Sequence, residues 1–105
     1  MVFHNHVILT GKVAKPPLRH YRPDGSPVIQ FPLELNHQEG SPEDNKTSRI
    51  DIVAVGKLAE LDPCLFQAGQ RLLVEGRLQQ RRWRTAEGRG LSRIEVIATD
   101  FRKTE

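Results

Sequence analysis

The residues best suited to chemistry stand in one short segment, 79–90, with the sequence QQRRWRTAEGRG. It holds the only tryptophan of the chain, Trp83, and four arginines within six residues of it: Arg81, Arg82, Arg84 and Arg89. A guanidinium can form a two-pronged contact with phosphate oxygens, and an indole stacks on flat partners. The segment therefore indicates either a surface for a flat, negatively charged partner or a tryptophan folded back as a structural prop.

Basic residues are segregated along the whole chain, although its net charge is only +3, with a pI near 9.4. Residues 77–93 contain six arginines, including Arg77 and Arg93, against the single acid Glu87. Residues 12–22 contain two lysines with Arg19 and Arg22, and no acid. The acids gather in HQEGSPEDN instead. This separation favours a polyanionic partner, although a solvated face remains open.

Length and composition predict one small domain over residues 1–105. No apolar run of 18 residues and no signal peptide is apparent, so we expect no membrane association and a cytoplasmic protein. The single cysteine, Cys64, excludes an internal disulfide and a cysteine-built zinc site. His4 and His6 could bind a metal only weakly, and no catalytic triad, carboxylate pair or phosphate-binding glycine loop is present. We therefore expect no enzyme, no metal and no cofactor.

Hydrophobic alternation predicts the elements that position these side chains. Five strands are expected, over 6–13, 28–36, 49–56, 70–84 and 91–101, with a short helix over 57–69 that is interrupted near Pro63. Inward positions include Phe31, Leu78 and Ile94, and outward ones include Val53. Pro32 cannot donate to a ladder, which places an edge or a bulge on one side of the second strand.

Three strands, a short helix and two strands is the element order of the OB-fold, a five-stranded all-β barrel. Five short strands bury little as an open sheet, so closure into a barrel is expected. That fold binds oligonucleotides on strands 2 and 3 and with the loops that join strands 1–2 and 4–5. In this chain those loops coincide with the two basic segments.

Several segments in order resemble landmarks of the bacterial single-stranded DNA-binding protein family: HVILTGKV, VAVGKLAE, AGQRLLVEGRLQQRRW and EVIATDF. They cover most of residues 6–101. The resemblance implies an OB-fold that binds single-stranded DNA with little sequence preference and that oligomerises.

The chain also departs from the main family. It stops at Glu105, where the main proteins continue into a long acidic-tipped tail, and by alignment on GKLAE, Arg49 and Val55 occupy places that usually hold aromatics. Its length and the motifs PLR, FPLEL and GLSR resemble the tail-less branch typified by primosomal replication protein N. That branch implies a homodimer that acts in replication restart with single-stranded DNA, a restart helicase and other primosome proteins. Another single-stranded DNA-binding paralogue, in recombination or repair, is the alternative.

The predicted DNA-binding residues centre on Trp83, the side chain that matches a stacking position of the family. Tyr21 is a second candidate for stacking, or else a tyrosine packed on a neighbouring strand. Arg49 is expected outward, to meet phosphate or to pair with Asp51 or a loop acid. The complete set is Arg19, Tyr21, Arg22, Arg49, Arg77, Arg81, Arg82, Trp83, Arg84, Arg89 and Arg93.

Two other functions fit the same features. One is a protein-interaction OB domain that binds an acidic partner, and the other is a cold-shock-type RNA chaperone, which the missing aromatic clusters disfavour. The first strand is apolar at the successive residues Val7, Ile8 and Leu9, so we expect a homodimer joined there, with a tetramer as the alternative. The acidic loop 38–47 is expected to be mobile and to lie outside the binding groove.

Overall fold

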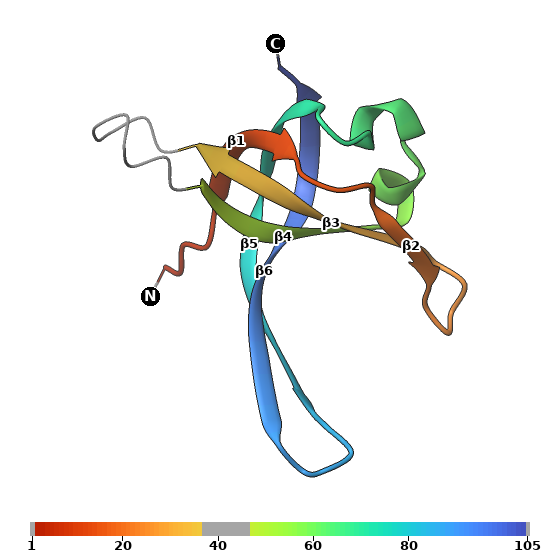
Figure 1. The fold of residues 1–105 in the computed structure, drawn as a ribbon, viewed down its shortest axis with the longest axis vertical. Helices are drawn as coiled ribbons and strands as arrows, with labels where there is room; N and C mark the ends of the chain where they lie inside the picture. The colour runs from red at the N-terminus through yellow and green to blue at the C-terminus, as the bar shows by residue number, and fades with distance from the viewer. Residues whose placement is uncertain (1, 37–46, 105) are drawn as a thin grey trace.

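The computed structural model describes residues 2–36 and 47–104 of the chain (Figure 1). Apart from Thr47, the predicted acidic loop 38–47 lies outside these residues. The strands are β1 (Val7–Val13), β2 (Leu18–Tyr21), β3 (Pro27–Asn36), β4 (Thr47–Val55), β5 (Arg71–Arg84) and β6 (Gly90–Lys103). Two 3-10 turns, η1 (Gly56–Glu60) and η2 (Pro63–Phe66), join β4 to β5.

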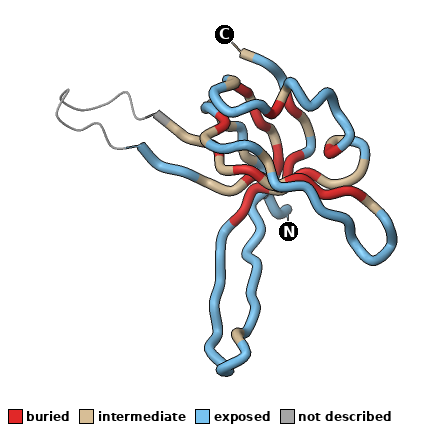
Figure 2. The backbone as a smooth tube through the Cα atoms, turned by 45° about the vertical axis from the view of Figure 1, so that its right-hand side comes forward, coloured by how far each residue is buried: buried red, intermediate tan, exposed pale blue. Residues whose placement is uncertain are grey.

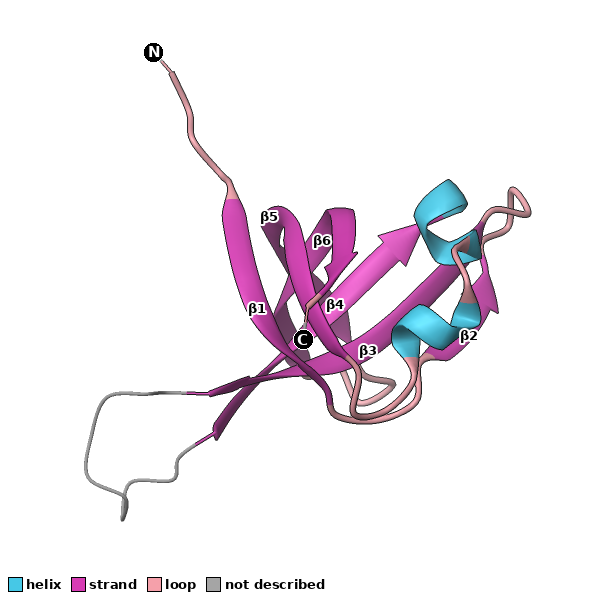
Figure 3. Cartoon of the chain, turned by 90° about the horizontal axis from the view of Figure 1, so that it is seen from above, coloured by secondary structure: helices cyan, strands magenta, loops and turns pink. Residues whose placement is uncertain are grey.

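The strands form one sheet in the order β1-β5-β6-β4-β3-β2, and an additional pairing of β1 with β3 closes a ring of five strands. Figure 3 shows these strands around a common centre. All neighbouring pairs are antiparallel except β4 and β6, which run parallel. Closure satisfies strand edges that an open five-stranded sheet would leave exposed. The predicted closed five-stranded architecture is therefore present.

The structure adds a sixth strand that the sequence analysis missed. Residues 16–27 are rich in turn formers, but Leu18–Tyr21 pairs with the start of β3, and all four of its side chains are exposed. With no buried face, β2 leaves no alternation in the sequence. Pro32 lies between the part of β3 that pairs with β2 and the part that pairs with β1, and its carbonyl accepts from the Ala14 N–H at 3.0 Å. The predicted interruption beside Pro32 is confirmed.

The predicted short helix over 57–69 is present only as two short 3-10 turns, and its predicted interruption near Pro63 is confirmed. A proline inside a helix removes a donor and clashes with the preceding turn. Pro63 instead begins η2, and the Asp62 carboxylate caps this turn by accepting from the Cys64 N–H at 3.0 Å. The break leaves Leu61 exposed and Cys64 at the surface, while Phe66 is buried.

The hydrophobic core fills the ring, where Figure 2 shows the buried residues gathered. Phe31, Phe66 and Phe101 form its aromatic centre, with ring centroids 5.1–6.0 Å apart. Val53 was predicted outward, and it lies outside the core cluster that contains its neighbours Ile52 and Ala54. It is nevertheless only 8% exposed, because it lies mid-sheet between its cross-strand neighbours Gln30 and Ile97.

β5 and β6 change register at Glu75 and Gly76, where Glu75 pairs with Asp100 and Gly76 with Ala98. Thr99 is therefore the extra residue of a bulge, and its hydroxyl donates to the Glu75 carbonyl at 3.2 Å. A bulge increases local twist and bends the strand. Here it lies where the β5–β6 hairpin leaves the ring.

The outer face of β1 is less apolar than its sequence suggests. Val7 and Leu9 are partly buried and pack against the core, whereas Ile8 points outward and is 58% exposed. Ahead of β1, the Asn5 side chain donates to the Leu78 carbonyl and accepts from the Leu78 N–H, both at 2.9 Å. Ile8 is therefore the one residue of the predicted interface set that is free to contact another chain.

Candidate nucleic-acid interface

The β5–β6 hairpin extends well beyond the ring (Figure 1), and we call residues 77–94 the hairpin arm. Every β5 residue from Arg77 to Arg84 is exposed. The two strands pair in register from Arg77↔Ile97 to Arg84↔Gly90. The tip is closed by the Gly88 N–H, which donates to the Thr85 carbonyl at 2.9 Å, with Gly88 at φ 83°. The arm is therefore a regular two-stranded ribbon that carries its side chains into solvent.

Leu78 and Ile94 were predicted to point into the core, and the structure shows them 44% and 54% exposed. The prediction continued the inward alternation of β5 and β6 beyond the point where the ring ends. The alternation is real, but in the arm the inward face has no opposing strands to cover it. Leu78 and Ile94 therefore belong to the exposed arm and not to the core.

Trp83 lies in the arm, outside the hydrophobic core, and is 37% exposed. The guanidinium carbon of Arg81 lies over its ring, 4.9 Å from the centroid. Residues i and i+2 of a strand share a face, so this cation–π contact follows from the strand geometry. The contact lies over one face of the indole, and the side chain stays partly exposed to solvent.

Two acids on the same face pair with predicted DNA-binding arginines. Arg93 donates to the Asp51 carboxylate at 2.9 Å, and the Arg81 Nε lies 3.8 Å from the Glu95 carboxylate. Sequence analysis missed Glu95, which stands just beyond the basic segment 77–93. Its parity on β6 with Arg93 was the available signal. Arg81 and Arg93 are therefore partly neutralised before any ligand binds.

Arg82 and Arg84 point to the other face of the arm, because neighbouring residues of a strand alternate. Arg82 donates to the Gln80 side-chain oxygen at 3.0 Å. Together with Trp83 and Leu91, these arginines line an open hollow of about 450 Å³ near the tip. Arg89 closes the turn through its backbone, which bonds to Thr85. The end of the arm thus presents cations around an indole.

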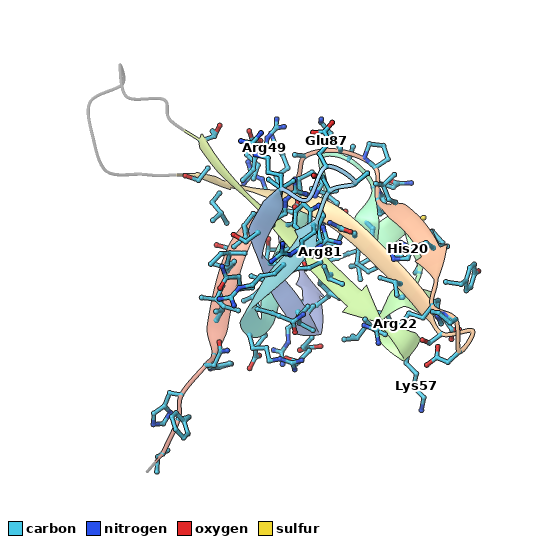
Figure 4. All side chains as sticks on the ribbon, turned by 90° about the horizontal axis from the view of Figure 1, so that it is seen from below. His20, Arg22, Arg49, Lys57, Arg81 and Glu87 are labelled. Carbon is cyan, nitrogen blue, oxygen red and sulfur yellow. The ribbon has the colours of Figure 1, made fainter. Side chains whose placement is uncertain are left out.

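The residues predicted on the other basic segment lie apart from the arm. The Arg19 guanidinium donates to the Ala59 carbonyl at 2.9 Å and so ties β2 to η1. Cross-strand partners share a face, and Tyr21 pairs with Pro27 while His20 pairs with Val28. In Figure 4, His20 and Arg22 lie on the β2 side of the molecule, away from Arg81. Among the described residues, the aromatic ring pairs join only Phe31, Phe66 and Phe101, so Tyr21 and Trp83 form no ring contact with each other. His20, which sequence analysis passed over, lies on the face of β3 that carries Gln30.

Arg49 and Arg77 extend the basic surface along β4 and β5. Both are exposed, and within the described part of the chain neither forms an ion pair with a carboxylate. The pair that was considered between Arg49 and Asp51 is absent, because Asp51 contacts Arg93. Unlike Arg81 and Arg93, these two arginines have no carboxylate partner among residues 2–36 and 47–104, and the loop acids considered as partners of Arg49 lie outside that part of the chain.

The histidines and acids of the described residues are the candidates for a metal site. No group of three or more metal-binding side chains occurs among them. The His6 Nε2 lies 2.7 Å from a Glu75 carboxylate oxygen, so His6, just ahead of β1, contacts a side chain of β5. Residues 2–36 and 47–104 also contain no helix with the length and hydropathy needed to span a membrane.

The five-stranded ring with its protruding hairpin is an OB-fold. Its architecture is similar to that of a solved structure described as a Plasmodium falciparum SSB complex with ssDNA, with a TM-score of 0.86. The match covers 100% of this chain and 98% of that one, at 24% sequence identity. The predicted fold class is confirmed, with the short helix replaced by the two 3-10 turns.

Sequence comparison assigns the family. The model of the single-strand binding protein family matches residues 4–104, so the chain belongs to that family. The single-stranded DNA-binding protein of Aquifex aeolicus is 35% identical over 102 residues, which cover 93% of this chain and 68% of that protein. The corresponding protein of Thermotoga maritima is 33% identical over 105 residues, which cover 97% of this chain and 74% of its own length.

Proposed function

We propose that this protein binds single-stranded DNA without strong sequence preference and without catalysing a reaction. The observation that carries the proposal is Trp83, a partly exposed indole on a solvated arm with arginines on both faces of the ribbon. Single strands expose unstacked bases and a row of phosphates, and non-specific binders combine stacking side chains with cations. Family membership supports the same ligand.

The arrangement favours low sequence preference. Stacking and phosphate contacts do not engage the base edges that carry sequence information. Around Trp83 the polar side chains are mainly arginines, which suit phosphates. Cations that form no ion pair with a carboxylate among the described residues are supplied by Arg49, Arg77, Arg82, Arg84 and Arg89.

A homodimer is part of the proposal, joined through β1 as the sequence predicts. Ile8 supports it, since this large apolar side chain is exposed on the outer face of the strand. The neighbouring Thr10 and partly buried Leu73, which pair with each other, continue that face. A tetramer would require a second surface.

The cellular role that we propose is cytoplasmic, in replication restart with a restart helicase and other primosome proteins. It rests on the motifs PLR, FPLEL and GLSR and on the scarcity of aromatic residues. A role in recombination or repair is the alternative. Stimulation of a purified restart helicase on forked DNA supports the first role, and stimulation of strand exchange alone supports the second.

Trp83 fluorescence tests DNA binding directly, because the chain has no other tryptophan. A single-stranded oligonucleotide should quench the emission and saturate, and duplex DNA of equal charge should bind more weakly because its base faces are hidden. An acidic peptide of equal charge is the control. If the peptide binds as well as the single strand, the arm is a protein-interaction surface and the proposal fails.

A further inference from the structure

Glu95 is the one charged side chain that is buried among the described residues, with 3% of its surface exposed. It does not point into the core. Its strand neighbour Val96 is fully buried there, so Glu95 belongs to the outer face of β6. A carboxylate is removed from water at large cost unless charges or donors compensate it. The contacts of Glu95 therefore identify what holds it in place.

Two side chains compensate Glu95, one from each side. Gln30 on β3 donates to it at 3.4 Å, and the Arg81 Nε on β5 lies 3.8 Å away. Both distances are long for a hydrogen bond, so the guanidinium charge is the main compensation. The same guanidinium lies over the Trp83 ring at 4.9 Å. Glu95, Arg81 and Trp83 thus form a continuous chain from the ring of strands into the arm.

On the basis of the DNA-binding function proposed above, we infer that Glu95 is a positioning residue for the DNA site. It anchors Arg81 against one face of the Trp83 indole. A base then stacks on the part of the indole that Arg81 leaves uncovered. Because its charge is already balanced, Arg81 orients the indole and does not neutralise a phosphate.

This division of roles predicts that Arg81 and Arg84 contribute differently to the salt dependence of DNA binding. For single strands, log K falls with log salt by about 0.7 for each phosphate that the protein neutralises. Arg84 has no carboxylate partner in the described residues and should contribute one such increment. Arg81 should contribute no such increment to the slope, because Glu95 already balances its charge.

The first test is Glu95→Gln, with Asp100→Asn as its matched control. Asp100 is also a β6 carboxylate paired with an arginine, Arg102 at 3.3 Å, so it reproduces the charge change at the far end of the strand. In the DNA-free protein, Glu95→Gln should increase acrylamide quenching of Trp83, because released Arg81 uncovers the ring. Asp100→Asn should leave the quenching constant at the wild-type value.

DNA titrations over a range of salt complete that test. Release of Arg81 makes it available to phosphate, so the Glu95→Gln slope should steepen by about 0.7 relative to wild type. At high salt its affinity should be about two- to fivefold lower, the worth of an exposed cation–π contact. The two curves should converge as salt falls. Asp100→Asn should keep the wild-type slope.

The charge-neutral double variant Arg81→Gln/Glu95→Gln keeps the inference testable if Glu95→Gln does not fold, since it leaves no buried charge unpaired. It should keep the wild-type slope while affinity falls about two- to fivefold. Arg84→Gln should make the slope shallower by about 0.7. If the slope of the double variant became shallower by the same amount as that of Arg84→Gln, the inference would be overturned, because Arg81 would then contact phosphate. Unchanged acrylamide quenching in Glu95→Gln would also overturn it.

The two proposals fail in different ways. If the wild-type protein does not bind single strands, the proposed function fails, but quenching in the DNA-free protein still tests whether Glu95 positions Arg81. If wild type and Arg84→Gln bind as expected while Glu95→Gln matches Asp100→Asn in slope and quenching, only the positioning role is wrong.

Discussion

The strands β5 and β6 run through both the ring and the hairpin arm, and their side chains meet opposite environments in the two regions. Within the ring, Leu72 and Val74 of β5 are fully buried, and their identities are fixed by packing. Past Gly76 the same strand has no buried residue. A two-stranded ribbon gains little stability from its own contacts. The arm is therefore free to carry charged side chains and an indole, while the ring supplies the stability that keeps them in place.

The largest expected effect is on the ring alone. Phe31 is buried against Phe66 and Phe101, so Phe31→Ala should lower the free energy of unfolding by about 3–5 kcal/mol. Denaturant titration of wild type and Phe31→Ala measures this difference in the free energy of unfolding. DNA affinity of the fraction that remains folded should stay at the wild-type level. Equal losses of stability and intrinsic affinity would show that the two regions are not separable.

Gly76 is the junction between the two regions, and Gly76→Ala should sharpen the comparison. A Cβ there would lie 2.3 Å from the Ile97 carbonyl oxygen, so the backbone must shift. We expect destabilisation of about 1–3 kcal/mol, typical of overpacking, together with a changed orientation of the arm. Gly90→Ala is the matched control, because its Cβ would meet nothing within 4 Å. Similar melting temperatures for the two variants would contradict the close-approach argument.

Ile8→Glu should separate the subunits without disturbing the core. Ile8 is exposed in the isolated chain, and a charge in an apolar interface is strongly unfavourable. Light scattering should show a dimer for wild type at micromolar protein and a monomer for the variant, with circular dichroism unchanged. Val7→Glu would unfold the protein instead, because Val7 packs against the core. A monomeric wild type would defeat the dimer proposal.

The smallest expected effect is at the β2–β3 turn. Ser26 donates its hydroxyl and its N–H to the Asp24 carboxylate, at 2.6 and 2.9 Å, and these bonds hold the pKa of Asp24 below its ordinary value of 3.8. The turn should therefore contribute its full stability above that ordinary value and lose it as pH falls through the lower folded pKa. NMR titration of Asp24 measures the shift. Ser26→Ala should return the pKa toward 3.8, and an unchanged value would contradict the assignment.

The sequence predicted the parts of the fold that alternation encodes. Phe31, Leu33 and Ile52 are buried as expected, and the closed order of strands follows from element order. It missed β2, whose side chains are all exposed, and it continued the inward face to Leu78 and Ile94. Alternation predicts which face of a strand points inward, but it does not predict where the neighbouring strands that cover that face end.

Composition alone singled out Trp83 and the arginines of segment 77–93 as candidates for the site, because composition needs no tertiary contact. The sequence did not predict that this segment leaves the ring as an arm. The pairing of Arg81 with Glu95, and of Arg93 with Asp51, joins residues from different strands and depends on register. Arg19 was placed in the site by charge, but its contact with the Ala59 carbonyl depends on where η1 folds. Local sequence patterns do not encode these contacts, because each contact joins residues from different elements of the fold.

The most direct test of the account is binding by Trp83→Ala, measured over a range of salt with circular dichroism and light scattering as controls for folding and assembly. Affinity for single strands should fall by about 1–3 kcal/mol at every salt concentration, because stacking releases no counterions. With about four or five arginines engaged, the slope of log K against log salt should stay near −3 to −4 in both proteins. A folded, correctly assembled Trp83→Ala that binds single strands as tightly as wild type would contradict the account.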